Sequence, residues 1–187
     1  MKNIYSHSAL FLIAAFLFAC NKPDLALINS VKSFESQWQN MNEKLNFLDR
    51  NLNLTDKKYE SDTKELGSFV SKNPTDTTQN VVGFELEFKR MVLQRNKIRT
   101  DYSLINREFG KEVKTFNEWQ RKLMKNKLNN KEAHATFDNY EKIYQKLDVQ
   151  IDSLTIQLTR NIDKHNKITR DKAFAIGNYN NFHINMH

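Results

Sequence analysis

A seven-residue repeat of apolar side chains restricts the fold of this chain more than any other feature. The apolar residues alternate in steps of four and three, which is the spacing of core positions in a supercoiled α-helix. Three tracts of nearly equal length carry the repeat, at 27–66, 84–123 and 133–168. Ten of twelve core positions are apolar in each of the first two tracts and nine of eleven in the third. At 1.5 Å per residue each tract predicts a helix roughly 55–60 Å long.

The connections between the tracts carry residues that end helices. Pro74 has no amide hydrogen and forces Asn73 towards an extended conformation, so the first helix must stop before this pair. We expect Asn129 and Asn130 to form a tight turn between the second and third tracts, and the repeat fails beyond Arg170. We therefore expect an all-α chain with helices at about 24–70, 80–127 and 131–170, followed by a tail at 171–187.

Three helices of matched length with short connections fold most simply into a long antiparallel three-helix bundle with coiled-coil packing. The core positions are rich in Phe, Tyr and Trp rather than Ile and Leu, and apolar residues extend onto the flanking positions of Val92, Val113 and Ile162. Such a wide stripe favours a bundle over a two-stranded coiled coil. A long hairpin that oligomerises, as in periplasmic chaperones of the Skp kind, remains the alternative. With only four Gly and two Pro, the chain lacks the turn residues of barrels and sandwiches.

Polar residues interrupt the apolar stripe at positions that an antiparallel register brings together. If Leu66 lies level with Phe84, and Leu123 level with Ala133, the interruptions of all three helices coincide. Thr55, Arg95 and Asn161 then share one layer, His165 occupies the next, and Asp62 the one after that.

Burying Arg95 alone would be unfavourable, so its guanidinium needs acceptors. The amide oxygen of Asn161, the hydroxyl of Thr55 and the carboxylate of Asp62 are the expected ones. Such a polar layer fixes the register of packed helices, as a buried Asn does in coiled coils. The sharper alternative is a small anion or ligand site with Arg95 as its charge.

The N-terminus carries an export signal. Lys2 precedes an unbroken apolar run from Ala9 to Ala19, which is too short to span a bilayer but has the length of a secretory signal core. The run ends in Leu17, Phe18, Ala19 and Cys20, and Cys20 is the only cysteine of the chain.

These last four residues resemble the lipobox of bacterial lipoproteins, although Phe18 is bulkier than usual at its position. The resemblance covers residues 1–20 only. It implies cleavage before Cys20 and attachment of a diacylglycerol and an acyl chain to that residue. The expected organisation is a signal peptide at 1–19, a lipidated tether at 20–24, a helical bundle domain at 25–170 and the tail.

Lipid attachment at Cys20 implies a place in the cell envelope. Several acyl chains on one residue hold a protein at a membrane without a spanning helix. Asn21 rather than Asp follows the cysteine, which by analogy with enterobacterial sorting favours the outer membrane over the inner one. The chain has a net charge of +7, but export removes it from the cytoplasm, so we expect no nucleic-acid partner.

The antiparallel topology places the turn between the second and third helices at the lipid-proximal end. That turn is basic, and cations near anionic headgroups contribute about 1 kcal/mol each. A surface that seats the bundle on lipid is one interpretation, and a solvated turn is the other. The basic residues are Arg121, Lys122, Lys125, Lys127 and Lys131.

The remaining residue patterns favour binding over catalysis. The sequence has no Ser/His/Asp or paired-carboxylate arrangement suited to a bundle, so we expect no catalytic residue, no enzyme activity and no cofactor beyond the lipid. His134, His165, His183 and His187 lack the spacing of a metal site. We expect another envelope protein to bind at the distal loop around Pro74 or at the tail.

Overall fold

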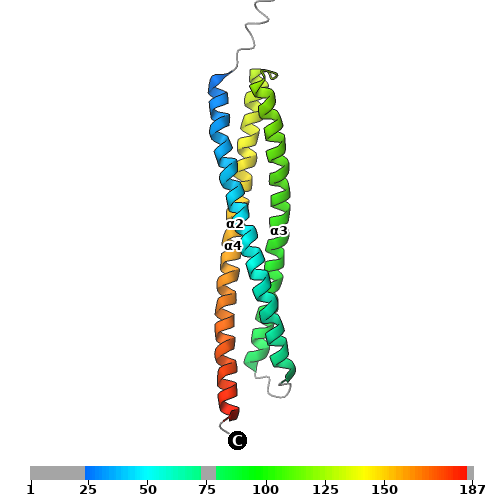
Figure 1. Ribbon diagram of the computed structural model, residues 1–187, viewed down its shortest axis with the longest axis vertical. Helices are drawn as coiled ribbons and strands as arrows, with labels where there is room; N and C mark the ends of the chain where they lie inside the picture. Colours follow the sequence, from blue (N-terminus) through cyan, green and yellow to red (C-terminus); the bar gives the residue numbers. More distant parts are fainter. Residues whose placement is uncertain (1–23, 73–78, 185–187) are drawn as a thin grey trace, which may run out of the picture. The chain divides into compact units, whose positions relative to one another are not determined.

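The chain folds into three antiparallel α-helices, which confirms the all-α bundle predicted from the repeat. The computed structural model describes residues 24–72 and 79–184. The helices are α2 (Leu25–Lys72), α3 (Gln79–Met124) and α4 (Asn130–Ile184), and these described ranges contain no strand. Figure 1 shows the three helices side by side.

The bundle divides into two compact units, each of which takes a piece of all three helices. Unit 1 comprises residues up to Met41 together with Glu108–Leu147, and unit 2 comprises Asn42–Arg107 with residues from Asp148 onward. The heptad repeat runs without interruption through all three boundaries, so the sequence predicted a single bundle domain and gave no sign of this division.

Within both units the predicted core positions point inward. Every described core position of the three tracts is buried, apart from Asp62, Glu112 and Tyr144, which are partly buried. Side chains that alternate by four and three face one side of a helix, so three such helices cover one another's stripes. Burial of these stripes is the main source of stability for helices of this length.

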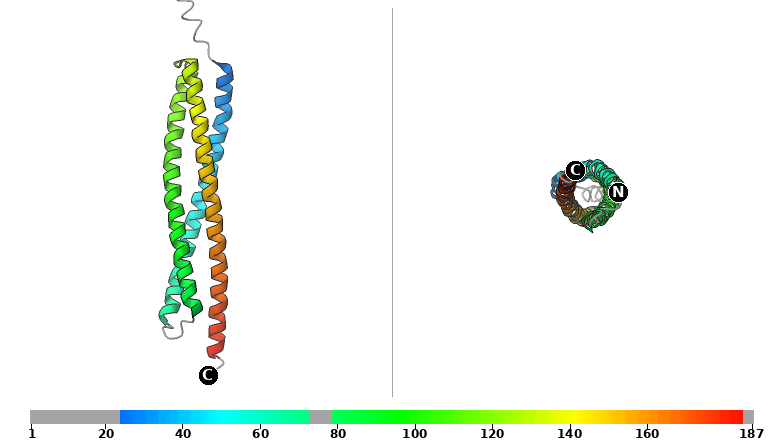
Figure 2. Two further views of the ribbon diagram at one scale, coloured as in Figure 1. Left: turned by 180° about the vertical axis from the view of Figure 1, so that it is seen from behind. Right: turned by 90° about the horizontal axis from the view of Figure 1, so that it is seen from below.

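Aromatic rings fill the core of unit 1. Phe34 contacts Trp38, Phe116 and Phe137 with ring centroids 5.3–5.8 Å apart. Trp38 lies 5.8 Å from Tyr144, as the antiparallel register predicts. In Figure 2, seen from behind, the yellow part of α4 lies beside both other helices in this unit. Edge-to-face ring pairs of this kind contribute about 0.5–1.5 kcal/mol beyond their buried area.

Side-chain and backbone caps set the helix ends in unit 1. Asp24 Oδ1 accepts a hydrogen bond from the Leu27 amide at 3.0 Å, so Asp24 caps the start of α2. Asn129 caps α4, because its Oδ1 accepts from the Lys131 amide at 2.8 Å. Asn126 adopts a left-handed backbone conformation with φ of 51°, and the Lys127 amide bonds back to the Lys122 carbonyl at 3.0 Å. This motif ends α3 at Met124 rather than at the expected residue 127.

The third helix corrects the sequence prediction. We expected it to end near residue 170 and residues 171–187 to form a tail, but α4 continues to Ile184. The apolar rhythm is broken at Lys172, yet the next core positions of the same pattern are Ala175, Tyr179 and Phe182. No proline follows Arg170, so a single polar position does not stop the helix.

Candidate functional site

Unit 2 contains a buried polar cluster at the positions where polar residues interrupt the heptad repeat. Thr55, Arg95, Asn161 and His165 are all buried, and the last two are each only 1% exposed. All three helices contribute to the cluster. Because buried polar groups are stable only with partners, the contacts of each side chain decide what the cluster can do.

Arg95 on α3 has acceptors on α2 and one on its own helix, since its Nη1 donates to Asn96 Oδ1 at 3.3 Å. One terminal nitrogen, Nη2, donates to the Leu52 carbonyl at 3.0 Å and forms an ion pair with Asp56. Asp56 also pairs with Arg99 at 2.6 Å, so two guanidinium groups share one carboxylate. Burial and the nearby charge of Arg99 lower the pKa of Arg95 to about 10. Arg95 therefore remains charged at neutral pH.

Asn161 on α4 joins the other two helices. Its Oδ1 accepts a hydrogen bond from the Tyr59 hydroxyl at 2.7 Å, and its Nδ2 donates to the Met91 carbonyl at 3.1 Å. One amide thus bonds to α2 and to α3 at the same level of the unit. Such a residue fixes the helix register, since a slip of either neighbour would leave buried polar atoms unpaired.

His165 lies one turn further along α4 and pairs with Asp62. The ring Nε2 is 2.7 Å from Asp62 Oδ2, and a carboxylate only accepts, so Nε2 carries a proton. The imidazole stacks on the Tyr59 ring at a centroid distance of 4.2 Å. Burial lowers the pKa of His165, and the hydrogen bond with Asp62 opposes that change in part. The neutral ring is thus the form that the folded unit favours.

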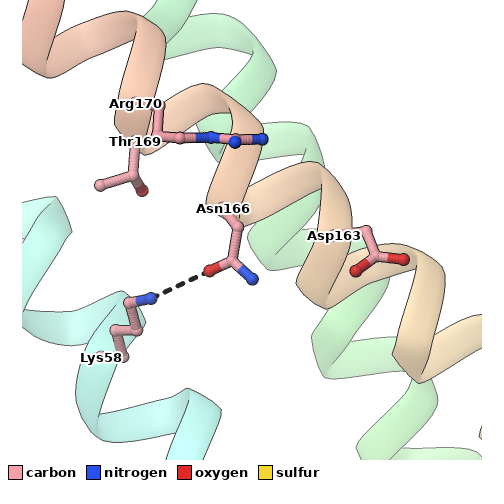
Figure 3. A pocket seen from close by; sticks show the side chains of 5 residues that line it. All are labelled: Lys58, Asp163, Asn166, Thr169 and Arg170. Carbon is pink, nitrogen blue, oxygen red and sulfur yellow. Dashed lines mark hydrogen bonds between the residues drawn. The ribbon is translucent and has the colours of Figure 1, made fainter.

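A surface pocket of about 590 Å³ lies beside this pair in unit 2. Lys58 on α2 donates to Asn166 Oδ1 on α4 at 3.0 Å across the pocket, and Thr169 reaches the buried ring of His165 at 3.5 Å. Figure 3 shows that Thr169 and Arg170 point in opposite directions, so the lining side chains do not converge on one point. The pocket therefore lacks the convergent polar groups that fix a small ligand.

The expected acceptors of Arg95 were wrong. Thr55 donates its hydroxyl to backbone carbonyls of its own helix, Asn161 binds Tyr59, and Asp62 binds His165. A long arginine reaches the edge of the core, where Asp56 follows Thr55 on α2. Core-position patterns do not include such flanking residues, which is why the sequence did not indicate Asp56 or Arg99.

Unit 1 presents the second candidate surface, at the turn between α3 and α4. His134 Nε2 on α4 lies 2.7 Å from Asp24 Oδ2 at the start of α2, so the beginning of α2 and the basic turn occupy the same end of the unit. Figure 1 shows this end. The exposed cations there form no ion pair within the described part of the chain; they are Arg121, Lys122, Lys125, Lys127 and Lys131.

His134 pairs with Asp24, and His165 pairs with Asp62. The side chains that the structure describes include no group of three that could ligate a metal. Residues 17–20, with Cys20, and His187 lie outside the described residues, as do the side chain of His183 and the loop at Pro74.

Comparison with known proteins gives no relative from which to infer a role. No family model, no curated protein and no solved structure matches this chain. Among the helices described here, none has an apolar stretch long enough to cross a bilayer.

Proposed function

We propose that this chain is a lipid-anchored helical protein of the bacterial cell envelope that acts as a binding, spacer or adaptor module. The observation that carries the proposal is the position of Cys20. This single cysteine directly follows an apolar export signal and the residues Leu17, Phe18 and Ala19. Diacylglycerol and an acyl chain such as palmitate on Cys20 anchor the mature chain to a membrane.

The start of the first helix supports this proposal. Asp24 caps α2, so residues 21–24 are the whole connection between the lipidated cysteine and the bundle. The contact between Asp24 and His134 brings the basic α3–α4 turn to the same end of unit 1. Anionic headgroups attract these cations, so the turn adds to the attachment that the acyl chains provide.

The residue after Cys20 indicates which membrane holds the chain. Asn21 rather than Asp follows the cysteine, and we propose the outer membrane as the location. The protein acts there by holding its helices against a second envelope protein. The region around the Pro74 loop and the residues after Arg170 are the distal binding regions in this proposal.

A chaperone of the Skp kind is the alternative, and the contacts within the units favour a closed module over it. A holdase needs splayed helices that offer apolar surface to unfolded clients. In unit 1 the rings of Phe34, Trp38 and Phe116 contact one another across the helices instead. Size-exclusion chromatography with light scattering tests this choice: a monomer supports the adaptor, and a stable trimer supports the chaperone.

Membrane fractionation of the Cys20→Ser variant tests the anchor. The unchanged chain should sediment with membranes and resist extraction by high salt, because acyl chains rather than charges hold it. Cys20→Ser removes the attachment site and should leave the chain uncleaved or in the soluble fraction. Replacement of four turn lysines by Gln in the lipidated chain should leave it membrane-bound. Identical fractionation of the wild type and Cys20→Ser would overturn the proposal.

A further inference from the structure

A second surface hollow, in unit 1, is lined by one helix alone. It has a volume of about 400 Å³, and all of its lining residues belong to α3. The hollow therefore lies on the side of α3 that no other helix of the unit covers. Its lining residues are Gly110, Val113, Lys114, Asn117, Glu118 and Arg121.

Gly110 lines this hollow, and no contact within the chain requires a glycine at this position. It lies in the interior of α3, far from both helix ends, where glycine destabilises a helix relative to alanine. A Cβ at this position would meet no atom within 4 Å, and the backbone φ is not positive. Neither close packing inside the chain nor an unusual backbone conformation requires a glycine here. Glycine also permits a close approach by the backbone of another molecule.

The other two described glycines differ in position. Gly67 and Gly83 are equally open to a Cβ, but they lie five residues or fewer from the ends of α2 and α3, where helices fray and glycine is less unfavourable. Gly67 is as open to a Cβ as Gly110 but lies outside the α3 hollow, so Gly67→Ala serves as the control for Gly110→Ala.

The charge of this α3 face is positive. Lys114 and Arg121 are seven residues apart, so they project from the same side of the helix two turns apart, with Asn117 between them. Both are exposed, and neither forms an ion pair with another described residue. Among the described residues, the nearby Lys111 forms an ion pair with Glu112 alone, at 3.9 Å. Glu118 lines the same hollow, so its three charged side chains carry one net positive charge, which favours carboxylates of a partner over cations.

From these observations we infer that the outer face of α3 in unit 1 is a docking surface for an acidic segment of a partner protein. The partner backbone crosses α3 at Gly110, its carboxylates pair with Lys114 and Arg121, and the half-buried Val113 provides apolar contact. This inference rests on the proposed function as a binding module and names the chemistry of its partner. A protein segment fits better than a lipid surface, because a flat bilayer needs no hollow.

Site-specific photo-crosslinking in the intact cell envelope tests the inference. The full-length chain carries a benzophenone amino acid in place of Asn117, and mass spectrometry maps the captured molecule. The inference predicts a protein crosslink at a peptide with an excess of Asp and Glu. Crosslinks to lipid alone, to a peptide without that excess, or to nothing would each overturn it. A benzophenone at Asn139, exposed on α4 of the same unit, should not capture that peptide.

Charge reversal separates the α3 face from general basicity. Lys114→Glu with Arg121→Glu should lower the crosslink yield about tenfold, since both changes remove attraction and add repulsion. Lys32→Glu with Lys142→Glu changes the net charge equally on the other two helices of unit 1 and should leave the yield unchanged. Equal losses in the two variants would contradict a local surface.

Comparison of Gly110→Ala with Gly67→Ala separates an effect of glycine on helix stability from an effect on docking. Gly110→Ala and Gly67→Ala should both raise the melting temperature, but only Gly110→Ala should lower the crosslink yield. If both leave the yield unchanged, the hollow plays no part in docking. Fractionation of the same samples distinguishes the failure of the lipid anchor from the failure of the docking surface. A soluble chain that still crosslinks to the acidic peptide would contradict only the lipid anchor. A membrane-bound chain that does not crosslink to this peptide would contradict only the docking surface.

Discussion

Arg95 and Arg99 share the single carboxylate of Asp56, so these three side chains together carry one net positive charge. The Nε atom of Arg95 is buried and has no hydrogen-bond partner among the described residues. Buried ion pairs contribute little net stability, but removing one partner leaves an unpaired charge in the protein interior, which is strongly destabilising. The two residues of the pair should therefore respond very differently to mutation.

Asp56→Ala should lower the free energy of unfolding by about 3 kcal/mol, because Arg95 stays buried and charged without its acid. Arg95→Met should lie within about 1 kcal/mol of the wild type or be more stable, since it removes the charge and keeps the apolar stem. Urea denaturation followed by circular dichroism measures both. Equal destabilisation by the two substitutions would contradict this reading of the pair. If Arg95→Met keeps the stability of the fold but no longer binds a partner that the wild type binds, the result supports an anion or ligand site at Arg95.

His165 should make the stability of the fold depend on pH. Burial lowers its pKa in the folded state below the ordinary value of 6.5, so the folded chain favours the neutral ring. The stabilising contribution is complete above pH 6.5 and is lost as the pH falls from there towards the lowered pKa. The urea concentration at the midpoint of unfolding should therefore decrease as the pH is lowered from about 7 to about 5. His165→Gln cannot titrate, and its midpoint should change less over the same range; parallel curves would exclude His165 as the cause.

The sequence indicated which polar residues are buried but not how they pair. The heptad repeat assigned Thr55, Arg95, Asn161 and His165 to core positions, and the structure buries all four. Pairing depends on side-chain length and on flanking residues, which a repeat of core positions does not describe. Asp56 lies at such a flanking position and became visible only in three dimensions.

At the scale of single elements, each helix end has an identifiable cause. Asp24 caps α2 through the Leu27 amide, and its other oxygen contacts His134. The amide hydrogen bonds and the His134 contact together lower the pKa of Asp24. Asp24→Ala should lower the melting temperature through loss of the cap. Asp24→Asn keeps a capping oxygen and should be closer to the wild type in thermal melting; equal loss in both would show that charge rather than capping matters.

In the interior of α3, by contrast, a substitution should stabilise the fold. Gly110→Ala should raise the free energy of unfolding by about 0.5–1 kcal/mol, because alanine loses less backbone entropy and its Cβ meets nothing. Differential scanning calorimetry on the purified chain measures the change. A loss of stability would mean that the backbone at Gly110 needs glycine for an internal reason, which would remove the basis for a docking hollow.

Element boundaries were predicted well where turn chemistry is strong and poorly where it is weak. Asn129 caps the start of α4, and the region before Pro74 ends α2, close to the expected residues. The end of α4 was misplaced because one polar core position, Lys172, looked like the end of the repeat. In a helix without proline a polar position costs little, so the backbone continues to Ile184.

At the scale of the whole molecule, the three-helix fold followed from periodicity because three matched apolar stripes can be covered only by one another. The division into two units did not follow, since the repeat is continuous across residues 41–42, 107–108 and 147–148. Function is harder still to read, because helical bundles serve many roles and only a local chemical feature distinguishes them. In this chain that feature is Cys20 after an apolar run, on which we base the proposal of a lipid anchor.

Mass spectrometry of the mature N-terminal peptide tests the central claim most directly. The chain is expressed in a bacterium with lipoprotein processing, extracted from membranes and digested. Our account predicts a peptide that begins at Cys20 and carries diacylglycerol and an acyl chain, with no such peptide from Cys20→Ser. A mature chain that begins elsewhere, or a Cys20 with a free thiol, would contradict the account.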